Sequence, residues 1–195
     1  MRQAVLRYSI HNRRKKAEKI SKWMKAHDCK TVLFVGVVGE ECAGDPNMAN
    51  ADIVEMKLMS DFDVKMGVNI YEAKTPYPFM IADARELPFD ENYVDCAFAN
   101  AIIEHVGGQT DQERMISEMT RVARCWVITT PNLWFPVESH TSAVFSHWRR
   151  SWRQRHADDF TRLLSLRQFR SLLPTDAKID GHVWSPTLTA YYCRQ

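Results

Sequence analysis

Residues 82–106 read ADARELPFDENYVDCAFANAIIEHV, and their pattern decides the fold that we predict. Residues 94–99 form a mostly apolar run of strand length, and the polar residues Asn100, Glu104 and His105 follow it. Asp83 comes at the end of another short apolar run, residues 79–82. Apolar strands that end in polar residues are typical of a buried parallel sheet whose ligand site lies beyond the carboxyl ends of the strands. We therefore expect a ligand site along this edge of a sheet.

Segments with strand and helix patterns alternate on both sides of this stretch. TVLFV, residues 31–35, is apolar on both faces, as expected of a buried parallel strand. A capping box of Thr110 and Glu113 predicts the start of a helix. The other predicted strands are 64–70, 125–130 and 187–193, and the other predicted helices are 12–27, 51–59 and 160–173. This alternation predicts an α/β fold, a mostly parallel sheet with helices on both faces and an antiparallel closing strand near the C-terminus.

Length and composition indicate one globular domain over residues 1–195, with 1–29 as a basic, helical N-terminal segment. The formal net charge of +2 does not by itself indicate a nucleic-acid partner. No apolar run is long enough for a signal sequence or a membrane span, so we expect a cytoplasmic protein. The five cysteines are odd in number and lack a C-x-x-C spacing, which favours buried reduced thiols over a disulfide framework or a zinc site.

Residues 82–106 resemble the core signature of class I S-adenosylmethionine-dependent methyltransferases that act on small molecules. In this family an acid ends the third strand, L-P-F follows it, and E-H-V follows the fourth strand. The chain has Asp83, Leu87-Pro88-Phe89 and Glu104-His105-Val106 in these places. TTPNLWFPVESHT (129–141) and FTRLLSLRQFRSLLP (160–174) are similar to segments of a bacterial branch of the family. The resemblance covers most of residues 30–190 and implies a Rossmann-like sheet with S-adenosylmethionine as the cofactor.

The resemblance also implies which residues contact the cofactor. A glycine turn after the first strand lets the backbone approach the methionine part. An acid after the third strand, with the neighbouring backbone amide, lies near the adenine, and the end of the fourth strand lies under the methionine. The implied cofactor-binding residues are Gly36, Val37, Gly39, Asn69, Glu72, Asp83, Ala84, Asn100 and Ala101.

Two positions depart from the family pattern. Phe34 stands where the first strand usually carries an acid, and Asn69 stands where an acid usually binds the ribose hydroxyls. An amide still hydrogen-bonds a hydroxyl, without charge assistance, and Glu72 is an alternative partner. The segment between the second and third strands is also too short for the usual intervening helix. These departures motivate a second hypothesis, a degenerate methyltransferase fold that acts as a binding or regulatory module.

For the reaction, we expect O-methylation of a small molecule or glycan by in-line transfer. The protein supplies orientation and a dry pocket, and a hydroxyl acceptor also needs a group that takes its proton. The candidate catalytic residues are His140, His105 and Glu138, with His140 favoured because its loop also holds aromatic residues such as Trp134. A structural role is the alternative for each histidine. We predict residues 131–160 to be an insertion on the acceptor side and expect no metal, because two ligands are weak evidence for one.

Two basic segments have competing interpretations. The predicted helix at 12–27 carries seven Lys and Arg residues, and a solvated face is favoured over a nucleic-acid site. Residues 147–156, HWRRSWRQRH, interleave two tryptophans with four arginines. A solvated helix with its tryptophans packed inward is favoured, and contact with a membrane surface, a lipid-linked acceptor or sugar rings is the alternative. Residues 99–102, ANAI, lack the proline and aromatic that hold a flipped base, so we expect no nucleic-acid acceptor.

Overall fold

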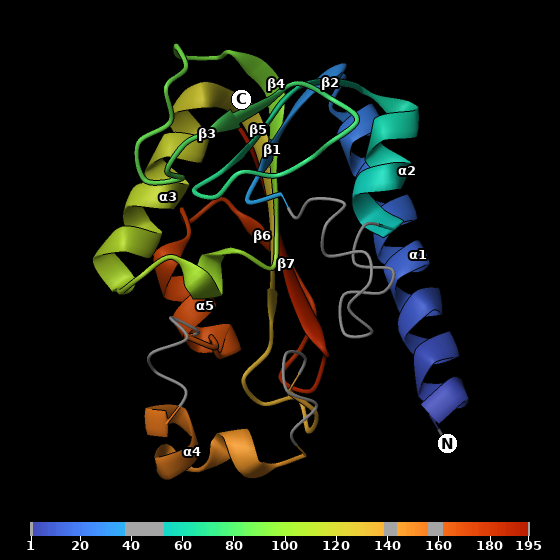
Figure 1. Ribbon diagram of the computed structural model, residues 1–195, viewed down its shortest axis with the longest axis vertical. Helices are drawn as coiled ribbons and strands as arrows, with labels where there is room; N and C mark the ends of the chain where they lie inside the picture. The colour runs from blue at the N-terminus through green and yellow to red at the C-terminus, as the bar shows by residue number, and fades with distance from the viewer. Residues whose placement is uncertain (1, 38–52, 139–143, 156–161, 195) are drawn as a thin grey trace.

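β1 (Thr31–Val35) lies between two parallel neighbours, β2 (Asp63–Asn69) and β4 (Val94–Asn100), in the computed structural model of the chain (Figure 1). The structure describes residues 2–37, 53–138, 144–155 and 162–194. Within these ranges, the sheet has seven strands in the order β3-β2-β1-β4-β5-β7-β6. The remaining strands are β3 (Phe79–Ile81), β5 (Ala123–Pro131), β6 (Lys178–Asp180) and β7 (Thr187–Cys193).

Strand direction in the sheet agrees with the prediction from the sequence. β1 to β5 pair in parallel, whereas β7 is antiparallel to both β5 and β6. The mostly parallel α/β sheet with an antiparallel closing strand is therefore confirmed. β6 was not predicted, because its three residues are mostly exposed and carry no apolar pattern.

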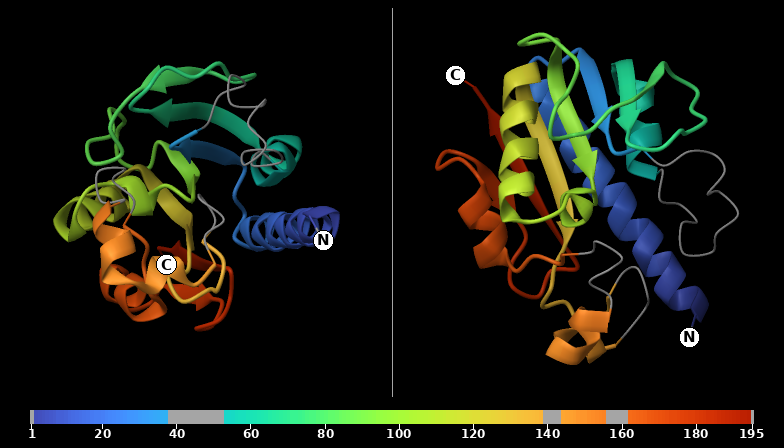
Figure 2. Two further views of the ribbon diagram at one scale, coloured as in Figure 1. Left: turned by 60° about the horizontal axis from the view of Figure 1, so that its bottom comes forward. Right: turned by 60° about the vertical axis from the view of Figure 1, so that its left-hand side comes forward.

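Helices cover both faces of the sheet (Figures 1 and 2). One face carries α1 (Arg2–Ala26) and α2 (Ile53–Asp61), and the other carries α3 (Gln109–Val122) and α5 (Leu166–Leu172). The remaining helical turns are α4 (Arg150–Arg155), η2 (Ile103–His105) and η3 (Ser146–Trp148). No helix in the described ranges has both the length and the apolar character needed to cross a bilayer.

Side chains of β1 alternate between two separate cores, which explains why the whole strand is apolar. Leu33 and Val35 join the core under α3 and α5, whereas Val32 and Phe34 join the core under α1 and α2. A strand covered on both faces has no position where a polar side chain reaches water. The buried stripe of α3 that the sequence predicts is also confirmed, namely Met115, Ile116, Met119 and Val122.

The capping box predicted for Thr110 and Glu113 is wrong. α3 begins at Gln109, and Asp111 Oδ2 accepts a hydrogen bond from the Gly108 N–H at 3.0 Å. Glu113 instead accepts a bond from the Gln109 side-chain amide at 2.9 Å. The chain turns at Gly107, where φ is 52°, and enters the helix two residues earlier than a Thr110 cap requires.

The helix predicted at 160–173 is shorter than expected in its described part. Residues 162–165 are not helical, and Leu164 pairs with Asn132 in an isolated bridge. α5 begins after Ser165, whose hydroxyl accepts a hydrogen bond from the Gln168 N–H at 3.3 Å. The helix ends just before Pro174, as predicted.

Two of the five cysteines form a disulfide, which corrects the expectation of reduced thiols. The antiparallel register of β5 and β7 places Cys125 directly opposite Cys193, and the two are bonded. Spacing along the chain does not reveal this pair, because 68 residues separate its members. Cys29 and Cys96 are buried free thiols, as expected, and Cys42 lies outside the described residues.

Candidate functional site

Strand order changes direction between β1 and β4, and polar residues gather at the carboxyl ends of these strands. The chain runs from β1 to β2 and β3 on one side, and from β4 to β5 on the other. In an open parallel sheet, this point leaves a crevice beyond the strand ends where ligands bind. Gly36 follows β1 and Asn100 ends β4, so both lie beside this crevice.

The turn after β1 is built so that only glycine fits at its first position. Gly36 has a φ of 77°, and its N–H donates to the Val68 carbonyl at 2.7 Å. A Cβ at Gly36 would lie 2.2 Å from Cγ1 of Ile102, in the segment after β4. The turn therefore packs directly against the end of the neighbouring strand. Gly39, also predicted to contact the cofactor, lies outside the described residues.

Asn69 holds this turn against the end of β2. Its Nδ2 donates to the Val37 carbonyl at 2.7 Å, and its Oδ1 accepts the Ile70 N–H at 2.7 Å. An ionised acid at this position has no hydrogen to give to Val37. The amide thus fits the local backbone, and its oxygen keeps a second lone pair for another donor. Glu72, the alternative ribose partner, is exposed.

Replacing Asn69 with aspartate is expected to lower the free energy of unfolding by about 1–2 kcal/mol at pH 7, because the Val37 carbonyl loses its donor and faces a carboxylate. Repulsion from that carbonyl raises the pKa of the new acid in the folded state, so stability should return as the pH falls and the acid protonates. Urea unfolding at pH 7 and pH 4 measures the change. Asn92→Asp, the same exchange at an exposed residue, should alter stability by less than about 0.5 kcal/mol. Equal losses in the two variants would contradict the proposed role of the amide.

Asn100 is the centre of a hydrogen-bond cluster that joins four elements. Its Oδ1 accepts from Lys16 Nζ of α1 at 3.1 Å and from Thr129 Oγ1 of β5 at 2.7 Å. Its Nδ2 donates to Glu55 Oε1 of α2 at 2.9 Å. The end of β4 therefore holds an ammonium and a carboxylate on either side of one amide.

Burial lowers the pKa of Lys16 to about 8, against the opposing effect of the nearby Glu55 and Glu104 carboxylates. Sequence reasoning placed Lys16 on a solvated helix face and missed both it and Glu55. A signal was present, because Lys16 precedes the buried Ile20 by four residues and so shares its side of the helix.

In the segment after β4, the two polar residues Glu104 and His105 differ in burial. Ala101 has a φ of 55°, and its N–H donates to the Thr129 carbonyl at 3.0 Å. In η2, Glu104 is completely buried and accepts a hydrogen bond from Thr130 Oγ1 at 3.0 Å. His105 is half-buried, at the end of the same turn. Glu104, which the sequence analysis did not select, is thus the buried neighbour in the chain of His105, one of the predicted bases.

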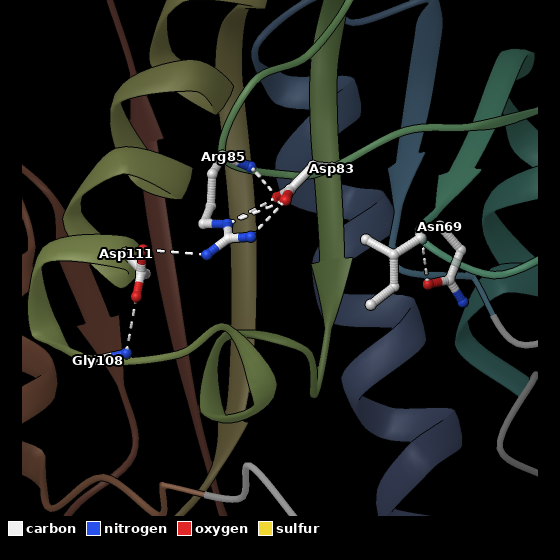
Figure 3. Close-up of polar contacts among 6 residues, drawn as sticks. Asn69, Asp83, Arg85, Gly108 and Asp111 are labelled. Carbon is white, nitrogen blue, oxygen red and sulfur yellow. Dashed lines mark hydrogen bonds and ion pairs between the residues drawn. The ribbon is translucent and has the colours of Figure 1, made fainter.

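Asp83 is engaged by the arginine two residues later (Figure 3). Arg85 Nε lies 3.0 Å from both carboxylate oxygens, and the Arg85 backbone N–H donates to Oδ1 at 2.8 Å. The same guanidinium donates to Asp111 at 3.1 Å. These hydrogen bonds from Arg85 lower the pKa of the Asp83 carboxyl, so the acid is ionised and fixed in place. Ala84, next to it, is buried.

The predicted acceptor-side residues follow β5. Trp134 is exposed, Phe135 is half-buried and Glu138 is buried, whereas His140 lies outside the described residues. His147, which sequence reasoning missed, is completely buried, and its Nε2 lies 3.1 Å from the Leu133 carbonyl and 3.0 Å from that of Phe135. Two carbonyl partners require a hydrogen on this nitrogen, so His147 fixes the start of the loop. Across the described ranges, no three His, Cys, Asp or Glu side chains group as a metal site would require.

Residues 46–125 match the family described as methyltransferase domain. A SAM-dependent methyltransferase from Methanosarcina mazei is 15% identical, with a TM-score of 0.53, and the alignment covers 86% of this chain and 94% of that one. A SAM-dependent methyltransferase from Thermotoga maritima, described as a possible histamine N-methyltransferase, is 12% identical, with a TM-score of 0.57 and coverage of 95% and 99%.

A third similar structure contains bound ligands. It is phosphoethanolamine N-methyltransferase 2 of Haemonchus contortus, in complex with phosphomonomethylethanolamine and S-adenosylhomocysteine. It is 16% identical, with a TM-score of 0.52, and the alignment covers 78% of this chain and 34% of that one. At these identities the structural similarity concerns the fold. No curated protein matches the sequence.

Proposed function

We propose that this chain, whose matched domain and fold are those of S-adenosylmethionine-dependent methyltransferases, methylates a hydroxyl group of a small molecule or glycan. The matched domain and the fold support an enzyme of this kind with S-adenosylmethionine as its cofactor. The predictions of the enzyme class and the cofactor are confirmed at this level. The acceptor, the histidine base and the individual site residues are proposals.

The cluster around Asn100 is the observation that carries the proposal. The amino-acid end of S-adenosylmethionine has a carboxylate and an ammonium, and the Lys16 ammonium and the Glu55 carboxylate flank the Asn100 amide. Opposite charges suit the two ends of this zwitterion. The turn at Gly36, where a Cβ would collide with Ile102, leaves backbone rather than a side chain beside the crevice. These groups fit the methionine part of the cofactor.

The remaining contacts follow the strand ends. Asn69, with Glu72 as the alternative, would bind the ribose, and Asp83 with the Ala84 amide would bind the adenine. For the methionine part, we assign the backbone of Gly36, Val37 and Gly39, the side chains of Lys16, Glu55 and Asn100, and the backbone of Ala101. Asp83 would have to accept from the adenine amino group while it remains bonded to Arg85, which its carboxylate allows because ionised oxygens accept several hydrogen bonds.

S-adenosylmethionine supplies a methyl group that is already activated by its positive sulfur. The chain's own task is to hold the acceptor oxygen in line with that methyl, to exclude water and to take the hydroxyl proton. We propose that His105 or His140 takes the proton, with Glu138 as the remaining candidate, and that residues 131–160 form the acceptor side. Of the two histidines, His105 is the one that the structure describes. It lies at the carboxyl edge of the sheet and follows the buried Glu104 in the chain.

A second candidate function is a binding or regulatory module. Phe34, at the position where the family usually has an acid, is buried against Tyr77 and Phe98, with ring centroids 5.3 and 5.9 Å away. The site therefore lacks the acid that the family usually has at position 34. In addition, the Asp83 carboxylate is already hydrogen-bonded to Arg85. A module of this kind would bind the cofactor or an analogue without transferring its methyl group.

Isothermal calorimetry with S-adenosylmethionine and S-adenosylhomocysteine tests the first step of the proposal. We expect one site per chain with micromolar affinity for both. No heat at about 1 mM ligand, which corresponds to a binding free energy weaker than about −4 kcal/mol, would contradict the enzyme assignment. Release of S-adenosylhomocysteine with a panel of phenolic and sugar hydroxyl acceptors then separates the two functions. An enzyme turns over with at least one acceptor class, whereas a module binds without turnover.

His105→Gln is expected to lower kcat about 100-fold or more with an acceptor from that panel, because glutamine keeps the polarity but cannot take a proton at neutral pH. The dissociation constant for S-adenosylhomocysteine should stay the same. The limb of the pH–rate profile that reports the base should also disappear. His182→Gln, at an exposed position far along the chain, is the matched control and should leave kcat unchanged. Equal kcat values in the two variants would assign His105 a structural role.

A further inference from the structure

Beyond the end of β5, large apolar side chains from separate segments gather on the surface of the protein. Each of these side chains is between 40% and 59% exposed, although such residues are usually buried. They come from the loop after β5, from the segment before η3 and from the turn before β7. The residues are Trp134, Val137, Val144, Phe145, Val183 and Trp184, and together with the arginines named below they form what we call the aromatic–arginine surface.

Trp148 joins these segments into one surface. Its ring centroid lies 6.1 Å from that of Trp134, 4.9 Å from Phe145 and 6.4 Å from Trp184. Its indole N–H donates to the Leu133 carbonyl at 2.9 Å, so the ring itself is anchored to the loop after β5. A bridge between Val137 and Val144 ties two further members together. The exposed rings are therefore held in a fixed arrangement.

Positive charge lies directly beside these rings. Arg149, Arg150, Arg153 and Arg155 are all exposed, on α4 or just before it. The stretch 144–155 contains no Asp or Glu, and across the described residues none of the four arginines forms an ion pair with a carboxylate. Arg153 Nη1 donates to the Trp148 backbone carbonyl at 2.9 Å, which holds one guanidinium at the backbone of the central residue. The surface thus combines exposed indoles with arginines that form no ion pair with any carboxylate in the described part of the chain.

The position of α4 leaves this surface open to a large partner. Figures 1 and 2 show α4 at one end of the molecule, beyond the carboxyl edge of the sheet and away from the other helices. Trp148 and Trp152 of the basic segment are half-buried, so the exposed rings belong mainly to the neighbouring segments. The arginines of α4 therefore lie at an end of the molecule.

We propose that the aromatic–arginine surface binds the headgroup layer of an anionic lipid bilayer. Tryptophan and phenylalanine side chains insert at the boundary between headgroups and acyl chains, and arginines pair with lipid phosphates. A hydrophobic protein partner would satisfy the rings but not the four adjacent arginines. A nucleic acid would satisfy the cations but not the exposed valines. The proposal does not depend on methyl transfer, and its test uses no cofactor.

Sedimentation of the full chain with vesicles tests the proposal. One set of vesicles is phosphatidylcholine with about 30 mol% phosphatidylglycerol, and the other is pure phosphatidylcholine. Because one basic residue near an anionic surface contributes about fivefold to partitioning, four arginines should give a preference of about 100-fold or more for the anionic vesicles. Tryptophan emission should shift to shorter wavelength on binding.

Two variants and one matched control distinguish this surface from general charge attraction. Replacing Arg149, Arg150, Arg153 and Arg155 with glutamine should remove the anionic preference. Replacing Trp134, Phe145 and Trp184 with alanine should weaken binding at least tenfold and reduce the emission shift, because the four remaining tryptophans, Trp23, Trp126, Trp148 and Trp152, are buried or half-buried. The control replaces four exposed cations near α1 with glutamine and so has the same net charge as the first variant; its residues are Arg14, Lys15, Lys22 and Lys30. Far-ultraviolet circular dichroism confirms folding of each variant.

The outcomes are decisive in both directions. Anionic preference that is lost in the arginine variant and kept in the α1 control supports the proposal. Equal binding to both vesicle types, no sedimentation with either, or equal loss in the two charge variants would overturn it. A concentration-dependent dimer that the alanine variant abolishes, without vesicle binding, would also overturn it and would assign the surface to a second copy of the chain.

Discussion

Replacement of Lys16 by methionine is expected to weaken binding of S-adenosylmethionine about 10- to 100-fold. A hydrogen bond to a charged group contributes about 1.5–3 kcal/mol, and the Lys16 ammonium is the cation beside Asn100. The fold itself should not lose stability, because burial disfavours the charged lysine. Weaker binding by a chain that is as stable as the original, or more stable, distinguishes a ligand contact from a structural one.

The pH dependence of the same variant gives a second signature. Burial lowers the pKa of Lys16 to about 8 in the folded chain, below its ordinary value of 10.5. Between these values the unfolded chain binds more protons than the folded chain, so the free energy of unfolding rises with pH across this window. The rise should be absent in Lys16→Met. Affinity for the cofactor should fall above pH 8 in the original chain, as the ammonium is lost, and more steeply than in the variant.

Calorimetry with S-adenosylhomocysteine at pH 7 and pH 9 measures these differences. Lys19→Met is the matched control, because Lys19 lies on the same helix and pairs with Asp180 at the surface. It should leave the affinity and its pH dependence unchanged. Equal affinities for Lys16→Met and the original chain would remove Lys16 from the site.

Replacement of Gly36 by alanine is expected to lower the free energy of unfolding by about 2–5 kcal/mol. A positive φ costs an L-residue about 1–2 kcal/mol, and steric overlap in a packed site adds about 1–3 kcal/mol. The overlap is specific, because the new Cβ would lie 2.2 Å from the Ile102 side chain. The melting temperature should fall by about 4–20 °C, since about 2–4 °C accompany each kcal/mol in a chain of this size.

Thermal unfolding of Gly36→Ala beside Gly108→Ala isolates this effect. At Gly108 the nearest atom to a new Cβ is 4.0 Å away and φ is −86°, so that variant should lose only the preference of a helix N-cap for glycine over alanine, about 0.5–1 kcal/mol. Adding Ile102→Ala to Gly36→Ala should cost less than the sum of the two single changes, because the overlap is then removed. Similar stability of the two glycine variants would refute the steric argument.

Much of the fold was predictable because apolar patterns report burial directly. TVLFV became β1 with the predicted bounds, since a strand covered on both faces must be apolar throughout. β6 was missed because an exposed edge strand of three residues carries no such pattern. The start of α3 was misplaced because the turn at Gly107 sets the first helical residue, and Thr110-x-x-Glu113 merely resembles a cap.

The site was predictable only where it lies at the end of a strand. Asn69 and Asn100 are the last residues of β2 and β4, and Asp83 comes two residues after β3, so the strand patterns locate them. Lys16 and the Cys125–Cys193 pair depend instead on which elements pack or pair across the fold. The sequence contains no local record of the cysteine pair, and for Lys16 its one signal is the spacing of four residues to the buried Ile20. The engagement of Asp83 by Arg85 likewise appears only when the side chains are placed.

α1 lies outside the matched region of residues 46–125, yet it contributes Lys16 to the cluster at Asn100. If a ligand at Asn100 gains affinity from Lys16, thermodynamic reciprocity requires that the ligand hold α1 to the sheet more tightly by the same factor. Docking of the N-terminal helix and occupancy of the crevice are then two readouts of one equilibrium. Any molecule that binds the exposed side of α1 and shifts its docking would therefore change the ligand affinity of the crevice from outside the matched region.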